Sequence, residues 1–260
     1  MDKLTSDPDI LAENEGKGGR ESGREGNDLV WELEDDVELN VVGNTHEANS
    51  KTVVLLAQAG GLEKLRKFTE IFYKKAFADP HIDKFIRSHN DPHGERFATW
   101  IAEKLGDPTH PWQENRRNRG RCPVDLGRAG MHAVTDRSSA HYAAWHSPKR
   151  EASKWGSHFN LQDSRIWLRL HFWALRESGL MVSAPNFSRY YAKFIGHFVR
   201  VYERQAQMFV RDSIRWSEEE ENTEGYLERG GTMPDVMVSD GEAIKGLPKE
   251  ERGGDGWPYV

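Results

Sequence analysis

Large apolar side chains recur at three- and four-residue intervals through the middle of this chain of 260 residues. Because an α-helix turns once in 3.6 residues, this spacing places them on one helix face. The pattern predicts four helices, over about 61–78, 93–105, 163–179 and 186–215, and Gly-Gly, Asp-Pro and Gly-Asp-Pro breakers flank the first two. The only stretch with a trace of period-two alternation is 30–42. We therefore predict an all-α core.

Charge and aromatic content divide the chain into three parts. Residues 1–50 carry 14 acidic and 4 basic side chains, residues 217–260 carry 12 and 4, and residues 51–216 have a net charge of +12. All eleven Phe and seven of the nine Trp lie between Phe68 and Trp216. The flanking parts are rich in Gly and charged residues, a composition that buries too little apolar surface to offset chain entropy. We predict a domain over 51–216 between two mostly disordered acidic arms.

Several protein classes are excluded by simple features. There is no apolar run of 18 residues, so we expect no transmembrane helix and no membrane partner. The first residues contain no apolar segment after their lysine, unlike a secretory signal. The single cysteine, Cys122, excludes a disulfide framework and a cysteine-based zinc site. We expect a soluble, cytoplasmic protein.

Residues 109–155 interrupt the helical rhythm. They are too many for an ordinary helix–helix connection, so we interpret them as an insertion with its own short helix near 138–155. The insertion carries a basic run that contains Arg116, Arg117, Arg119 and Arg121. Because the run has no interleaved aromatics, a solvated loop is favoured first, docking of the acidic arms second and nucleic acid last.

The four periodic segments resemble those of a known family. GGLEKLRKFTEIFYKKAFADPHIDKFI resembles the opening of a truncated haemoglobin, and RFATWIAEKLGDP resembles its distal helix. WLRLHFWAL is similar to the tryptophan-bearing helix of the group 2 branch, and FSRYYAKFIGHFVRVYE to the closing helix. The resemblance covers about 55–205 and implies a globin-like, two-over-two helical sandwich.

This resemblance implies a haem pocket between the helices. Tyr73 matches the family's tyrosine, and Trp167 its tryptophan, that donate hydrogen bonds to iron-bound oxygen. The alternative interpretation is that both are ordinary core residues. The expected pocket residues are Phe72, Tyr73, Trp100, Trp155, Phe159 and Trp167.

The family's proximal histidine has no direct counterpart. When Trp167 is set on the family's tryptophan, the proximal position falls on Lys154. Three candidate iron ligands stay open: His158, one helical turn beyond Lys154; His146, at the head of the same stretch; and Lys154 itself in its neutral form. A pocket filled by aromatic side chains, without haem, is the fourth possibility.

The resemblance implies a haem-binding globin that binds oxygen or NO, as a carrier or a sensor. If the protein is an enzyme, it implies haem-dependent NO dioxygenase or peroxidase-like activity, since the chain has no hydrolase, phosphate-loop or zinc-protease motif. The alternative is a haem-free globin-fold interaction or sensor module. A homodimer is compatible with the sequence.

Overall fold

The computed structural model describes residues 37–42, 45–119, 122–125, 131–134 and 137–252, and only the backbone between 119 and 139. Most of the described residues are helical, which confirms the all-α class. The predicted disorder of residues 1–36 lies outside the described part. None of the described helices combines the length and hydropathy needed to cross a membrane.

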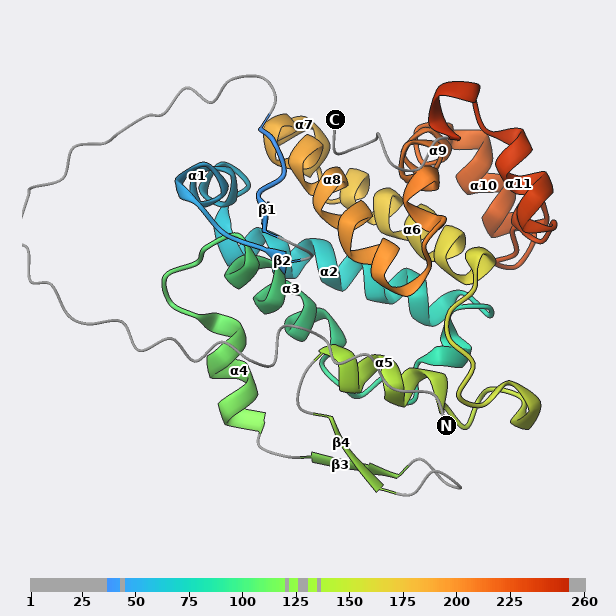
Figure 1. Ribbon diagram of the computed structural model, residues 1–260, viewed down its shortest axis with the longest axis horizontal. Coiled ribbons are helices and arrows are strands. Elements are labelled where there is room, and N and C mark those ends of the chain that lie inside the picture. The colour runs from blue at the N-terminus through green and yellow to red at the C-terminus, as the bar shows by residue number, and fades with distance from the viewer. Residues whose placement is uncertain (1–36, 43–44, 120–121, 126–130, 135–136, 253–260) are drawn as a thin grey trace, which may run out of the picture.

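Four long helices form the centre of the fold (Figure 1). They are α2 (Gly61–Ala78), α3 (His93–Lys104), α6 (Leu161–Glu177) and α8 (Pro185–Tyr202). The predicted helix over 186–215 ends early, because the backbone of Glu203 is extended. A 3₁₀ turn over Ala206–Phe209 and helix α9 (Val210–Trp216) follow it.

The ends of these helices follow from local chemistry. Helix α2 stops at Asp79, whose backbone is extended because a residue before proline disfavours the helical conformation. Beyond α3, Gly106 has a φ of 98°, and a Cβ there would lie 2.8 Å from a methyl carbon of Val53. Helix α6 begins at Leu161, after the N-cap Asn160, and not at 163 as predicted. Asn160 and Asp163 each accept the other's backbone N–H in a capping box.

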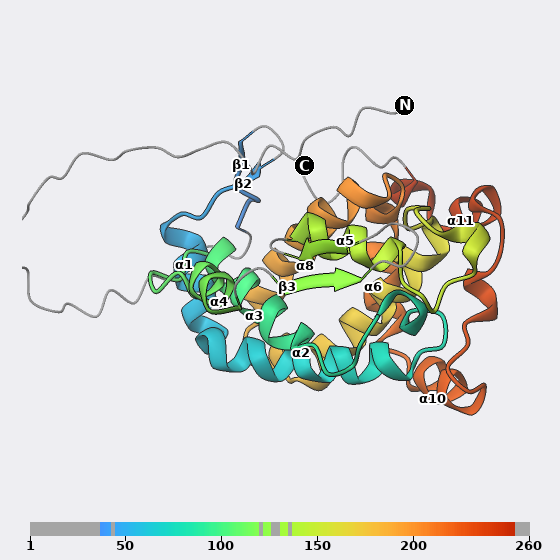
Figure 2. The same cartoon turned by 90° about the horizontal axis from the view of Figure 1, so that it is seen from below.

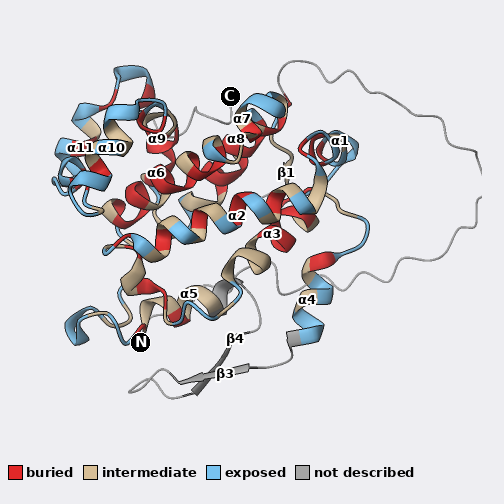
Figure 3. Ribbon diagram, turned by 180° about the vertical axis from the view of Figure 1, so that it is seen from behind, coloured by how far each residue is buried: buried red, intermediate tan, exposed pale blue. Residues whose placement is uncertain are grey.

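The core lies where α2, α6 and α8 meet α3. Helix α2 packs against both α3 and α6. Tyr191 of α8 contacts the rings of Phe68 on α2 and His171 on α6, and all three residues are fully buried. Buried residues run along all four helices; α2 and α8 also carry exposed residues, whereas α3 has none and α6 has only Glu177 (Figure 3). The periodic apolar residues of the sequence are therefore the ones that form the core between the helices.

The insertion has secondary structure of its own. It contains α4 (Pro111–Arg119), an antiparallel hairpin of β3 (Cys122–Asp125) and β4 (Met131–Val134), and α5 (Arg137–Trp145). In Figure 1 the hairpin and α5 lie beneath α2 and α3, and in Figure 2, the view from below, β3 and α5 lie in front of α6 and α8. The predicted helix near 138–155 ends at Trp145, three residues before Pro148, and only a 3₁₀ turn over Ala152–Lys154 follows.

The C-terminal part is folded, and the prediction of a mostly disordered tail over 217–260 is wrong for its described residues. Two helices form there, α10 (Glu220–Glu228) and α11 (Asp240–Gly246), with 3₁₀ turns over Pro234–Val236 and Lys249–Glu251. Its buried apolar side chains are distributed along the described part of the tail: Tyr226, Met233, Val236, Ala243 and Leu247. Composition averaged over the tail could not show this distribution.

Ion pairs join this tail to the central helices. Asp235 lies 2.7 Å from Arg169 of α6, Glu218 2.9 Å from Arg176 of α6, and Glu251 2.6 Å from Arg215 of α9. The arginines of the insertion are not in these pairs: Arg116 and Arg117 are exposed on α4, and the side chains of Arg119 and Arg121 lie outside the described part.

The folded part also begins before residue 51. Val37 is buried, strands β1 (Val41–Val42) and β2 (Thr45–His46) pair antiparallel, and α1 (Ser50–Gln58) follows. The imidazole Nε2 of His46 lies 2.7 Å from the hydroxyl of Tyr190 on α8. This contact attaches the segment before α1 to the core.

Candidate functional site

A cavity of about 690 Å³ lies among the central helices and α5. This volume is within the range of about 300–1,000 Å³ that is typical of small-molecule and cofactor sites. Its walls are mainly apolar and aromatic, with polar side chains from the segment between α2 and α3. The principal lining residues are Phe72, Tyr73, Phe85, His93, Arg96, Phe97, Trp100, His141, Phe159, Asp163, Trp167, Phe198 and Tyr202.

Helices α2 and α6 bring Tyr73 and Trp167 to this cavity. The ring of Phe72 lies between them, edge-on to both, at centroid distances of 5.0 and 5.4 Å. The indole of Trp167 stacks on the buried His171 with centroids 4.4 Å apart, which holds its plane. Burial lowers the pKa of His171 to about 3, so this imidazole is neutral.

Five of the six expected pocket residues line the cavity. They are Phe72, Tyr73, Trp100, Phe159 and Trp167. The sixth, Trp155, does not. Its indole N–H donates to the backbone carbonyl of Arg150 at 3.2 Å, inside the loop between α5 and α6.

The three candidate iron ligands of the sequence do not line the cavity. His158 and Lys154 are exposed, and the ring of His158 stacks on Trp145. His146 donates through Nδ1 to the carbonyl of Tyr142 at 2.8 Å. The reason is geometric: residues 146–160 form turns and extended chain, so the helical offset that linked Lys154 to His158 does not exist there.

His141 reaches the cavity instead. It lies on α5, and its ring is edge-on to Tyr202 at 4.2 Å and to Phe159 at 5.6 Å. Ala140, Ala143 and Ala144, which have small side chains, line the cavity as well. His141 was not among the ligand candidates predicted from the sequence, which were His158, His146 and Lys154. Alanines at helical spacing around one histidine are the signal that was present.

His93 is the second histidine in the wall. Its ring stacks on Tyr73, with centroids 5.2 Å apart and planes at 23°. Its Nε2–H donates to the carbonyl of Ser88 at 3.0 Å, and Nδ1 accepts from Arg96 at 3.5 Å. Burial and the charge of Arg96 lower the pKa of His93 below its usual value of 6.5, against the opposing charge of Asp91. The imidazole is therefore neutral at pH 7.

One end of the cavity carries a buried carboxylate, Asp163. It accepts a 2.6 Å hydrogen bond from His81, and Lys84 lies 3.5 Å away. Burial acts to raise the pKa of Asp163, but the bonds from His81 and from the Asn160 N–H, with the charge of Lys84, bring this pKa below its ordinary value. The carboxylate is ionised and paired within the wall.

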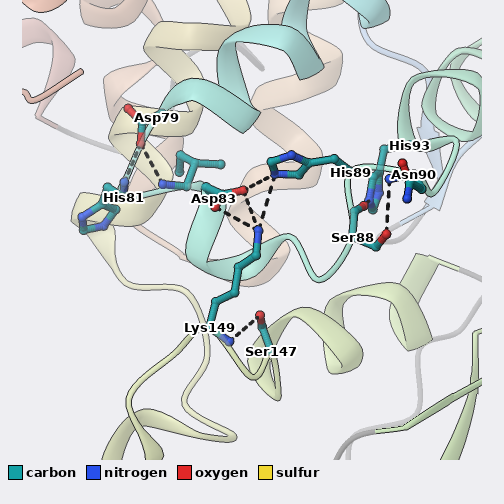
Figure 4. Close-up of polar contacts among 10 residues, drawn as sticks. Asp79, His81, Asp83, Ser88, His89, Asn90, His93, Ser147 and Lys149 are labelled. Atoms are coloured by element: carbon teal, nitrogen blue, oxygen red, sulfur yellow. Dashed lines mark hydrogen bonds and ion pairs between the residues drawn. The ribbon is translucent and has the colours of Figure 1, made fainter. Parts of the chain in front are cut away.

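Polar contacts join the turn after α2 to the loop after α5 (Figure 4). The ammonium of Lys149 lies 2.9 Å from both carboxylate oxygens of Asp83, and His89 lies 2.6 Å from the same carboxylate. Burial opposes ionisation of Asp83, but His89 and Lys149 bring its pKa below the usual value. Nearby, Arg87 donates to the carbonyl of His146 at 3.1 Å. These contacts therefore connect the turn after α2 with the loop after α5.

Among the described residues, no group of three or more His, Cys, Asp or Glu side chains is arranged to hold a bare metal ion. A scan against protein-family models gave no match, and searches of curated proteins and of solved structures gave none either.

Proposed function

We propose that the cavity is a haem pocket and that the protein is a haem-binding globin of the truncated type, which binds a diatomic gas. One observation carries the proposal: a single cavity is lined by Tyr73 and Trp167 from α2 and α6 and by His141 from α5. The helix order α2, α3, α6 and α8, with aromatic cores at their contacts, supports a globin-like arrangement.

The lining residues fit a haem group. The walls are aromatic and apolar, as a porphyrin requires, and His141 brings an imidazole, a side chain that serves as axial ligand of haem iron, to the cavity. Arg87 and Arg96 also line the cavity, and guanidinium groups pair well with carboxylates such as the propionates. Haem, when bound, supplies the gas binding and any redox chemistry.

The chain's own residues would then determine how the gas is held. Tyr73 and Trp167 bring an O–H and an indole N–H donor to the wall of the cavity. Bound oxygen carries partial negative charge, so such donors strengthen its retention, and the effect grows where aromatic walls exclude water. This arrangement supports oxygen or NO binding by a carrier or a sensor.

Hemin titration of the purified full chain tests the proposal. We expect a Soret band that saturates at about one equivalent per chain, as one cavity of this size implies. His141→Ala should abolish the saturable band, whereas His146→Ala and His158→Ala should keep it, since neither residue lines the cavity. A chain that takes up no hemin would contradict the proposal and favour the haem-free interaction module.

A further inference from the structure

Two aromatic stacks attach the segment from Ser88 to His93 to helix α2. Tyr73 stacks on His93 with centroids 5.2 Å apart, and Phe77, one helical turn further along α2, stacks on His89 at 4.4 Å and 16°. The segment forms part of the cavity wall, because Ser88 and His93 both line it. His89 does not line the cavity, so the two stacks differ in whether they border the site.

His93 is held in place by polar contacts on both ring nitrogens. Nε2–H donates to the carbonyl of Ser88, and Nδ1 accepts from Arg96, which is itself paired with Asp91. Since Nε2 is bonded to Ser88 and Nδ1 to Arg96, the ring turns its face, and not an N–H group, to Tyr73. The His93 imidazole is thus held in a fixed orientation, and the Tyr73 phenol stacks on its face.

We infer that His93 is a positioning residue for Tyr73, which holds the phenol at the cavity wall and thereby sets how long a gas molecule stays bound. The gas-binding part of this inference rests on the proposed function; the positioning part does not. An aromatic pair adds stability beyond the burial of its area alone, which restricts a phenol that borders the cavity.

The same geometry makes the position of Tyr73 sensitive to pH. The groups that face the His93 ring are Tyr73 from α2, Arg96 from α3, and Asp91, His89 and the Ser88 carbonyl from its own segment. A proton added at Nδ1 of His93 would lie beside the positively charged Arg96 guanidinium. Nδ1 could then no longer accept the hydrogen bond from Arg96. Protonation should therefore loosen the ring and the phenol stacked on it.

The positioning part is tested without haem, by ¹⁹F NMR of the full chain labelled with 3-fluorotyrosine. The Tyr73 resonance is the one that disappears in Tyr73→Phe. We expect this resonance to shift between pH 7 and pH 5 in the wild type and to lose the shift in His93→Phe, which keeps the stack but cannot titrate. A Tyr73 resonance that titrates equally in both proteins would overturn the inference.

The functional part is tested on the ferrous, hemin-reconstituted chain by stopped-flow oxygen dissociation. His93→Gln keeps an amide donor for Ser88 but loses the ring, and should release oxygen about two- to tenfold faster. His158→Gln, at an exposed histidine that does not line the cavity, is the control and should leave the rate unchanged. Equal rates in wild type and His93→Gln would overturn the inference. A chain that binds no hemin would refute the proposed function alone and leave the NMR result to decide the positioning.

Discussion

The hydroxyl of Tyr226 donates a 2.9 Å hydrogen bond to Oδ2 of Asp79, which joins the C-terminal helix α10 to the end of α2 across 147 residues of chain. Oδ1 of the same carboxylate accepts the backbone N–H groups of His81 and Ile82. Ile82 lines the cavity and His81 bonds to Asp163. The acidic tail therefore helps to hold one wall of the candidate site.

Removing this hydroxyl should destabilise the fold. Asp79 is fully buried, so Tyr226→Phe leaves its carboxylate without one donor, at a cost of about 1–3 kcal/mol in the free energy of unfolding. Urea denaturation measures the change. The matched control is Leu227→Ala, a neighbour on α10 that is 61% exposed and should cost no more than about 0.5 kcal/mol. Equal stabilities of the two variants would contradict this role of Tyr226.

Stability should fall as the pH is lowered from 6.5 towards 4. Burial, with the charges of Lys104 and His197, lowers the pKa of His46 to about 4, so the folded state holds this imidazole neutral while the unfolded chain protonates near 6.5. The contribution of His46 to the free energy of unfolding is fully present above pH 6.5. It is lost as the pH falls towards 4, by up to about 3 kcal/mol.

Replacing His46 should flatten this dependence. In His46→Gln, urea unfolding at pH 7 and at pH 5 should differ less than in the wild type. His158→Gln is the control, because His158 is exposed and its loss should leave the slope as it was. A wild-type slope that persists in His46→Gln would assign the acid sensitivity to other groups.

Trp167→Phe and Tyr73→Phe should each speed the release of oxygen from the reconstituted protein. Both changes keep a ring in the wall but remove the polar hydrogen, and a net hydrogen bond of about 0.5–1.5 kcal/mol corresponds to a two- to about tenfold faster rate. Stopped-flow dissociation measures it. Trp173→Phe serves as control, since Trp173 contacts Trp216 and Tyr226, away from the cavity. An unchanged rate in both variants would show that neither donor reaches the ligand.

Filling the cavity should block hemin without unfolding the chain. Ala144 lines the cavity beside His141, so Ala144→Trp places an indole where the cofactor would lie. We expect the hemin stoichiometry to fall towards zero while the far-ultraviolet circular dichroism stays unchanged. Ala152→Trp, in an exposed turn, should bind hemin normally. Normal uptake by Ala144→Trp would place the binding site elsewhere.

The helices were predictable where their signals are local. For α2 and α3, apolar spacing and the adjacent Gly and Asp-Pro breakers act within a few residues, and the predicted bounds agree closely with the structure. The tail was mispredicted because a few anchors, such as Tyr226, bury themselves against distant helices. The composition of the tail is an average over its residues, and it does not indicate which apolar side chains are buried against the core.

Tyr73 and Trp167 were predicted as pocket residues, and the cavity brings them together because each lies on an inward stripe of a regular helix. Periodicity along one helix is a property of the sequence by itself, and so is the all-α class that follows from it. The histidine of α5 that lines the same cavity, His141, was not predictable in this way. Whether His141, His146 or His158 reaches the cavity depends on where α5 ends and how the loop from 146 to 160 folds back. Those features arise from packing between distant segments, so only the tertiary structure decided them.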